Sequence, residues 1–536
     1  MVSIPLFMQR FSSALLGLAL CQLLAQPLLA QRYDLLIRNG RIVDGSGNPW
    51  YRAEIAIKSG KIVAIGPDLA ANEAVEVLDA GGMVIAPGFI DVHTHVEGSL
   101  EDTPTADNFL YDGVTTIITG NCGSSNTNLA DYFAKLRTLQ ISPNFASLMG
   151  HNAVRRAVMK LSRRNPSPEE LVKMEAIMDQ GMRDGAVGLS TGLIYIPGTY
   201  ASTAEVIALA KVAAKYRGVY ASHIRNEADS VLPAIREAID IGRQAGLPVE
   251  ISHLKTSGRN NWDRSSELIA AVEAARAEGI DVNVDQYPYT ASSTNLGVLL
   301  PSWALADGDS ALATRLADPV TKKQIVKSIK DNTLRQSGSK RLDYAFVARH
   351  RADSSCNGKN IQQIAAQRLG RKPSLNDEIE TVLQLMLAGG AQMIYHTMSE
   401  EDIKRILQYP NTMIASDAGV AKFGRDVPHP RAYGTNARVL GRYVRELKII
   451  RLEDAVRRMT SLPAQRFGFG DRGLLKLGLA ADLVIFDPDQ ITDQATFDKP
   501  HAYATGIAHV YVNGVAVVRA GKHTGARPGQ VLTRAE

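Results

Sequence analysis

The fold prediction starts from the stretch Ala86-Pro-Gly-Phe-Ile-Asp-Val-His-Thr-His95. Its apolar part reads as a β-strand, and the strand ends in a His-x-His pair. Side chains two residues apart in a strand point to the same face, so the imidazoles of His93 and His95 are expected to project together. At the end of a barrel strand they can share a metal ion. The alternative is a pair of surface histidines beside a turn.

Seven further segments resemble this one, because each is an apolar strand that ends in polar residues. The eight candidates are Met83–His95, Val114–Cys122, Pro143–His151, Ala186–Thr191, Val219–Arg225, Pro248–Lys255, Asp281–Tyr289 and Thr412–Asp417. Helical patterns follow most of them, for example at residues 230–239 and 262–277. Eight such units predict an α/β fold, a (β/α)₈ TIM-like barrel, with its active site at the C-terminal strand ends.

The two ends of the chain differ from this alternating middle. Short β-strands separated by Gly and Asn-Gly turns occupy residues 33–86, and the same pattern returns from residue 473. These ends predict a small β-sandwich domain built from residues 31–86 and 468–536, around a barrel of residues 87–467. The mostly helical segment at about residues 296–411 is too long for a loop, and we interpret it as an insertion over the barrel mouth.

Three further candidate metal ligands end other predicted strands. His223 ends the fifth strand and His253 the sixth, which makes them neighbours in a barrel, although either alone reads as a packed or surface histidine. Cys122 ends the second strand. Soft sulfur together with imidazole selects zinc. The alternatives for this cysteine are a small buried hydrophobe or a disulfide with Cys356.

Asp417 ends the eighth predicted strand in the sequence Ile-Ala-Ser-Asp. A lone aspartate at a strand end is often a helix cap. In the predicted barrel, however, its carboxylate faces the metal, where it can take a proton from the attacking water. We therefore predict a catalytic role for Asp417.

With these motifs the chain resembles the amidohydrolase superfamily, and within it the D-aminoacylase (N-acyl-D-amino-acid deacylase) family. The resemblance runs along nearly all of the chain after residue 30. It is carried by Asp34–Gly45, Pro87–His95, Thr119–Gly123, Ser222–Glu227, Ser252–Lys255, Tyr287–Tyr289, His429–Arg431 and Gly478–Pro488. The cysteine is the most discriminating feature, since hydantoinases and dihydroorotases normally use a carboxylated lysine as the metal bridge.

The resemblance implies one tightly bound Zn²⁺ held by Cys122, His223 and His253. It implies a second, weaker metal site at His93 and His95. It also assigns the general acid/base role to the carboxylate that ends the eighth strand.

Four more positions match the family's binders of the substrate α-carboxylate. They are Lys255, Tyr287, Ser293 and Arg431. Lysine and arginine attract an anion, and arginine can hold a carboxylate with two parallel hydrogen bonds. The loop at residues 418–428 looks longer and more charged than the family's usual segment, so Arg425 is a rival to Arg431.

The implied function is zinc-dependent hydrolysis of the amide bond of small N-acylated D-amino acids, giving a carboxylate and a free D-amino acid. One alternative is another amidohydrolase activity, on cyclic amides or on dipeptides that contain a D-residue. A second alternative is a metal-free binding protein on the same fold, which the complete set of expected ligands disfavours.

The composition is that of an ordinary globular protein, with 45% hydrophobic and 21% charged residues. The formal charge of +5 is not clustered, so a nucleic-acid partner is not expected. At the N-terminus, Arg10 precedes an apolar run at residues 11–29, which predicts a signal peptide over residues 1–30 and an exported, periplasmic or secreted protein without a stable membrane span. The alternatives are a retained membrane anchor and lipoprotein processing at Cys21.

Overall fold

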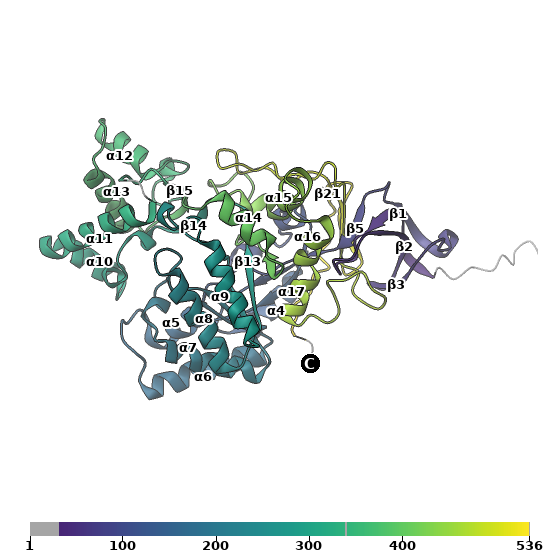
Figure 1. Ribbon diagram of the computed structural model, residues 1–536, viewed down its shortest axis with the longest axis horizontal. Helices are drawn as coiled ribbons and strands as arrows, with labels where there is room; N and C mark the ends of the chain where they lie inside the picture. Colours follow the sequence, from purple (N-terminus) through teal and green to yellow (C-terminus); the bar gives the residue numbers. More distant parts are fainter. Residues whose placement is uncertain (1–31, 338–339, 535–536) are drawn as a thin grey trace, which may run out of the picture.

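The computed structural model describes residues 32–337 and 340–534, so the predicted signal peptide lies outside the described residues. Figure 1 shows three parts: a central barrel, a β-rich part at one end that contains strands from both chain termini, and a mostly helical part at the other end. Within the described residues, no helix combines the length and the apolar character needed to cross a membrane.

The barrel strands are parallel and pair largely in sequence order. In the described chain they are β6 (Phe89–Asp91), β7 (Val114–Thr119), β8 (Asn144–Ser147), β9 (Met149–Gly150), β10 (Gly188–Gly192), β11 (Val219–His223), β12 (Val249–Ile251), β13 (Val282–Gln286) and β17 (Thr412–Ile414). Pairing runs β6-β7-β8 and β9-β10-β11-β12-β13-β17. A single residue, Leu148, separates β8 from β9, so the two act as one strand and the predicted eight-stranded barrel is confirmed.

Backbone hydrogen bonds close the ring where the regular ladders stop. The N–H of Val187, just before β10, donates to the carbonyl of Ser147 at the end of β8 (2.9 Å). At the other seam, the N–H of Asp417 donates to the carbonyl of His93 (2.8 Å). The second seam brings the end of the last strand beside the end of the first.

The predicted first strand, Met83–His95, is two strands in the structure. β5 (Val84–Pro87) pairs with strands of the terminal sheet, whereas β6 starts the barrel at Phe89. Gly88 lies at the break, where a Cβ atom would come within 2.2 Å of Thr115 Oγ1. The backbone passes too close to the next strand there for any side chain. Because β5 and β6 belong to different sheets, the prediction of one continuous strand is wrong here.

Helices cover the outside of the barrel. They are α4 (Leu129–Leu139), α5 (His151–Met159), α6 (Pro168–Arg183), α7 (Thr203–Lys215), α8 (Val231–Ala245), α9 (Ser265–Ala277), α14 (Glu400–Gln408), α16 (Leu452–Met459) and α17 (Ser461–Phe467). Local sequence sets their ends: α6 begins in a capping box of Ser167 and Glu170, and α8 ends at Gly246 in the left-handed region (φ 74°).

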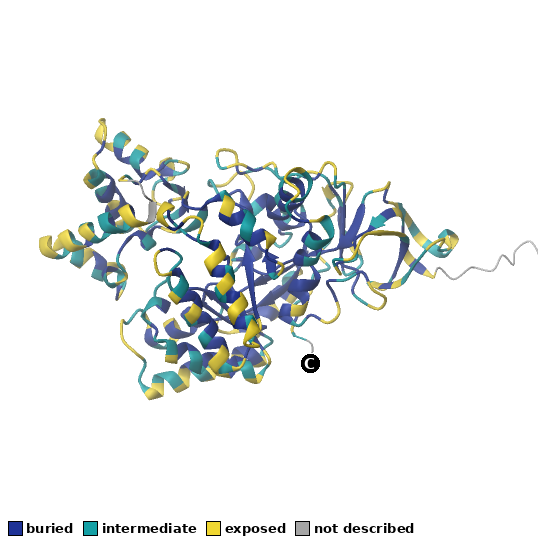
Figure 2. Ribbon diagram, in the orientation of Figure 1, coloured by how far each residue is buried: buried dark blue, intermediate teal, exposed yellow. Residues whose placement is uncertain are grey.

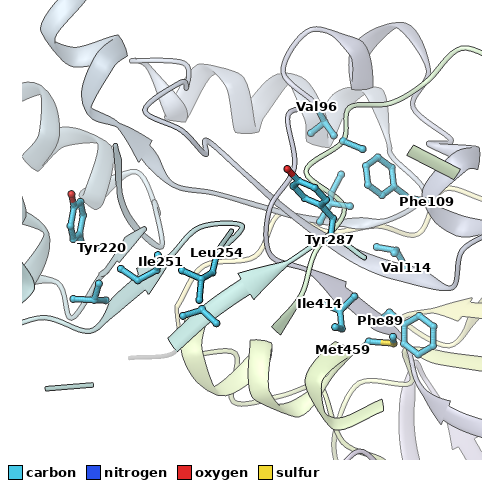
Figure 3. Packing of buried hydrophobic residues seen from close by; sticks show 14 of the residues in the cluster. Phe89, Val96, Phe109, Val114, Tyr220, Ile251, Leu254, Tyr287, Ile414 and Met459 are labelled. Carbon is cyan, nitrogen blue, oxygen red and sulfur yellow. The ribbon is translucent and has the colours of Figure 1, made fainter. Parts of the chain in front are cut away.

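The core lies between the strands and these helices. Figure 2 shows the strands buried and the outer helix faces exposed. Figure 3 shows part of the main hydrophobic cluster, with Phe89, Ile251 and Ile414 among the labelled side chains. The apolar side chains of the strands form part of this core. The polar residues at the strand ends lie outside it and can form a site.

Both ends of the chain form one sheet. Among the described residues it has nine strands in the order β21-β20-β19-β18-β5-β1-β2-β3, with β4 paired to β1. The strands are β1 (Tyr33–Ile42), β2 (Tyr51–Lys58), β3 (Lys61–Gly66), β4 (Ala74–Asp79), β5 as above, β18 (Leu483–Phe486), β19 (Ile507–Val512), β20 (Val515–Arg519) and β21 (Lys522–His523). The antiparallel pair β5–β18 joins the N-terminal strands to the C-terminal ones.

The segment between β13 and β17 has a hydrophobic core of its own. Its helices are α10 (Asp309–Ala317), α11 (Pro319–Ser337), α12 (Ile361–Leu369) and α13 (Leu375–Leu387). It also contains a three-stranded sheet of β14 (Ser292–Asn295), β16 (Gln392–Tyr395) and β15 (Ala345–Arg349), which the mostly helical prediction lacks. The predicted range 296–411 starts after β14 and includes α14, which packs on the barrel helix α9.

Candidate active site

The predicted ligands gather at the C-terminal ends of the barrel strands. One of these ligands is the last residue of its strand, and the others follow their strands within a few residues. His93 and His95 follow β6, Cys122 follows β7, His223 ends β11, His253 follows β12 and Asp417 follows β17. Side chains from five strands therefore face one another across the barrel mouth.

The sulfur of Cys122 contacts three imidazoles. Cys122 Sγ is 3.3 Å from His93 Nε2, 3.5 Å from His223 Nδ1 and 3.7 Å from His253 Nε2. None of the four residues is more than 8% exposed. Sulfur and nitrogen ligands of a tetrahedral zinc ion lie about 3.6 Å apart, given Zn–S and Zn–N bonds of about 2.3 and 2.05 Å. The spacing around Cys122 thus fits a zinc ion.

A second group shares His93 with the first. Asp417 Oδ1 lies 3.1 Å from His95 Nε2 and 3.6 Å from His93 Nε2. The side chain of His95 is 34% exposed, whereas that of His93 is fully buried. The ligand atoms of these three residues lie close enough together to hold a metal ion. This second group is more open to solvent than the group around Cys122.

Three of the site residues have a strained backbone. Cys122 (φ 52°), His253 (φ 37°) and Asp417 (φ 51°) lie in the left-handed region, which non-glycine residues rarely adopt. Such conformations cost about 1–3 kcal/mol each and persist where the surroundings enforce them. At His253 the backbone N–H donates to Asp285 Oδ1 (2.8 Å). These turns aim the side chains inward directly after their strands end.

Burial sets the protonation states of the cluster. It lowers the pKa of His223 well below its usual value and also lowers the pKa of His253, so each imidazole is neutral and has one nitrogen with a free lone pair. Burial alone would raise the pKa of Asp417, but the nearby Arg431 charge and the imidazoles hold it well below its usual value. Burial raises the pKa of the Cys122 thiol, and a bound cation would oppose this by stabilising the thiolate. The donor set suits a divalent metal.

Comparisons with known proteins show the family to which the chain belongs. The amidohydrolase family model matches residues 76–518. N-acyl-D-glutamate deacylase from Alcaligenes xylosoxydans xylosoxydans is 37% identical, over 94% of this chain and 98% of that protein. D-aminoacylase from the same organism is 36% identical over the same shares. The chain belongs to the D-aminoacylase family of amidohydrolases.

A solved structure shares the fold of this amidohydrolase. N-acyl-D-glutamate deacylase from Bordetella bronchiseptica, crystallised with zinc and a phosphonate inhibitor that mimics the tetrahedral intermediate, matches with a TM-score of 0.79 and 36% identity. The match covers 94% of this chain and all of that one. The family and the α/β fold class predicted from the sequence are thereby confirmed.

Three of the four predicted carboxylate binders of the amidohydrolase lie around the ring of Tyr287, and one of them pairs with Asp417. The Arg431 guanidinium lies 4.5 Å from the centroid of the Tyr287 ring, and its Nη1 is 2.9 Å from Asp417 Oδ2. Lys255 Nζ is 5.6 Å from the same ring centroid. Ser293, on β14, joins this group through its backbone, because its carbonyl accepts from Arg431 Nη2 (3.3 Å).

The hydroxyl of Ser293 accepts a hydrogen bond from Gln392 of the neighbouring strand β16 (3.0 Å). The rival cation, Arg425, has a side chain that is 67% exposed and lies 4.0 Å from Asp426, whereas the side chain of Arg431 is 5% exposed. Arg431, and not Arg425, is therefore the cation buried beside Asp417.

The two described cysteines of the amidohydrolase are both free, so the alternative of a Cys122–Cys356 disulfide is wrong. Cys356 lies in the core of the inserted part, where its thiol contacts Asp353 Oδ2 (3.4 Å). Cys122 is therefore available to a metal.

Sequence reasoning gave no role to two acidic residues behind the imidazoles. Asp285 Oδ2 lies 3.5 Å from His93 Nδ1. Glu227 Oε1 lies 3.1 Å from His253 Nδ1 and 2.6 Å from Lys255 Nζ. An acidic residue inside the buried strand β13 is the signal that points to Asp285, and a carboxylate four residues after a strand-terminal histidine is the signal that points to Glu227.

A pocket opens beside His223, between the barrel mouth and the inserted part. Its barrel side contains Tyr195, whose ring centroid lies 4.6 Å from that of His223. The lining residues are Ile194, Tyr195, His223, Asn226, Glu227, Ala228, Ser257, Ser292, Thr294, Val298, Leu299, Tyr344, Tyr395 and Thr397. Among these described residues there is no lysine or arginine, so a group bound here meets mainly apolar and neutral side chains.

Proposed function

We propose that this chain hydrolyses the amide bond of N-acyl-D-amino acids and releases a carboxylate and a free D-amino acid. The observation that carries the proposal is the buried cluster of Cys122, three histidines and Asp417 at the strand ends of a D-aminoacylase-family barrel. Two relatives that share most of its length are deacylases of N-acylated D-amino acids, by their names.

We assign the tightly bound zinc to Cys122, His223 and His253, and a second, weaker metal site to His93 and His95. Cys122 Sγ also contacts His93, so the residues that would hold the two metal ions are adjacent. A zinc ion bound here would supply Lewis-acid polarisation of the amide carbonyl and would acidify the attacking water.

The chain's own residues then handle the proton and the substrate anion. Asp417, held ionised beside Arg431, accepts the proton of the attacking water and delivers it to the departing amide nitrogen. Lys255, Tyr287, Ser293 and Arg431 would bind the α-carboxylate. With the carboxylate and the scissile carbonyl both held, one direction remains for the side chain, which selects the D-enantiomer.

The pocket beside His223 supports a neutral, apolar group on the substrate. Burying a carboxylate there without a cationic partner is costly. We expect kcat/KM for N-acetyl-D-leucine to exceed that for N-acetyl-D-glutamate by at least about tenfold. A panel of N-acetyl-D-amino acids, their L-enantiomers, hydantoins and D-containing dipeptides measures this. A preference for the acidic substrate would contradict the pocket assignment, and turnover confined to hydantoins or dipeptides would overturn the deacylase function.

We propose that residues 1–30 direct export and are removed, so that the enzyme acts outside the cytoplasm. The support is the charged start at Arg10, the apolar run after it and the small Ala30 before Gln31. The full-length gene product expressed in a Gram-negative host should appear in the periplasm or medium, and intact mass spectrometry should show a chain that begins at Gln31. A cytoplasmic chain that keeps residues 1–30 would refute this.

A further inference from the structure

One carboxylate lies behind two of the assigned zinc ligands. Glu227 follows the end of β11 by four residues, and its side chain is 12% exposed. Its Oε1 atom lies 3.1 Å from His253 Nδ1 and 3.7 Å from His223 Nε2. The other ring nitrogen of each histidine faces the sulfur of Cys122, at 3.5 Å for His223 Nδ1 and 3.7 Å for His253 Nε2.

This arrangement bears on which ring nitrogen carries the proton. A neutral imidazole has one N–H and one bare nitrogen, and only the bare nitrogen can bind a metal. An ionised carboxylate is an acceptor and favours an N–H on the nitrogen that faces it. Glu227 therefore favours the tautomers in which His223 Nδ1 and His253 Nε2 are bare toward Cys122. At His253 it acts against the Lys255 ammonium, which lies 2.9 Å from Nδ1 and, as a donor only, favours a bare Nδ1.

Direct binding of a metal by Glu227 is disfavoured by Lys255. The ligand atoms of Glu227, His223 and His253 lie close enough to hold an ion. However, Lys255 Nζ is already 2.6 Å from Glu227 Oε1 and 2.9 Å from His253 Nδ1. A second cation in that space would be repelled, so an orienting role fits the contacts better.

We infer that Glu227 is a positioning residue that orients His223 and His253 for zinc through their outer nitrogens. The same Glu227 oxygen holds Lys255, which links the zinc ligands to the side chain assigned to the substrate carboxylate. This inference rests on the zinc site assigned under the proposed function. Carboxylates behind metal-bound histidines typically change metal affinity by about 10–100-fold.

The test compares zinc affinity between variants of the full enzyme. Metal-free protein is titrated with zinc against a chromophoric chelator, which reports the dissociation constant without any activity assay. Glu227→Gln keeps the size but removes the charge, and we expect it to raise the zinc dissociation constant by about 10–100-fold. Cobalt substitution should show a changed visible absorption spectrum in the same variant, because the imidazoles lose their fixed orientation.

Two comparisons separate this role from general damage. Glu237→Gln removes a carboxylate from another partly buried ion pair, with Arg225 (2.8 Å), and should leave zinc affinity within threefold of wild type. Lys255→Met should likewise leave zinc affinity within threefold, but raise KM. That result would show that the Glu227 effect does not act through the ammonium.

The outcomes of this test separate a failure of the inference about Glu227 from a failure of the proposed function. Wild-type zinc affinity in Glu227→Gln overturns the inference, even if the wild-type enzyme binds zinc and deacylates its substrates. If Glu227→Gln does not fold, Glu227→Asp serves instead, because it withdraws the carboxylate by one methylene group. That variant should weaken zinc binding by more than threefold, and an unchanged dissociation constant overturns the inference. A wild-type enzyme without zinc would refute the assigned metal site as well.

Discussion

Replacing Asp417 by asparagine is expected to lower kcat by about 10²–10⁴-fold, the usual contribution of a general acid/base. Asparagine keeps the size of the side chain but cannot accept and return a proton. Asp417 lies beside His95, His93 and Arg431, and it is not in contact with the sulfur of Cys122 in the structure. The tightly bound zinc should therefore remain, as metal analysis of the purified variant would show.

A neighbouring carboxylate supplies the control for this prediction. Asp426 lies in the same loop, and its side chain is 27% exposed beside Arg425. Asp426→Asn should keep kcat within about twofold of wild type, since surface ion pairs contribute little. More than a tenth of wild-type turnover in zinc-loaded Asp417→Asn would show that another group moves the proton.

Replacing Cys122 by alanine is expected to give the largest loss of zinc. Its sulfur contacts all three imidazoles of the cluster, so the substitution removes the atom on which the site is centred. Loss of a direct ligand should weaken zinc binding by more than the roughly 100-fold upper range for an outer contact. Activity should fall with the zinc content, and the melting temperature should approach that of chelator-treated wild type, because bound metal stabilises the folded state.

The second free cysteine provides a matched variant. Cys356 is also buried, but it lies in the core of the inserted part. Cys356→Ala should retain wild-type zinc content and turnover. Equal zinc binding by Cys122→Ala and wild type would remove the basis of the metal assignment.

The barrel and its ligands could be predicted from sequence because their signals are local. His93 and His95 are two residues apart directly after an apolar run, and Cys122, His223 and Asp417 each close an apolar run. The C-terminal ends of the strands in a barrel meet at one rim, so polar residues at those ends converge whatever the lengths of the helices between them.

Other features depend on contacts between segments that are distant in the chain. The break between β5 and β6 arises because β5 pairs with β1 and β18 of the terminal sheet, whereas β6 pairs with β7 of the barrel. The sheet of the inserted part was missed because strands as short as β14 and β16 carry too little periodicity to be distinguished from helix.

The amino-acid sequence by itself determined which residues come at or just after the ends of the barrel strands, and so which thiol, imidazole and carboxylate groups could meet at one rim. Only the tertiary structure decided how they meet. Distances and burial reflect packing between strands, which is why the sulfur of Cys122 touches three imidazoles and Arg431, not Arg425, is buried beside Asp417. The position of Glu227 behind His253 likewise depends on the fold, because the two residues follow different strands, β11 and β12, which pair only in the folded sheet.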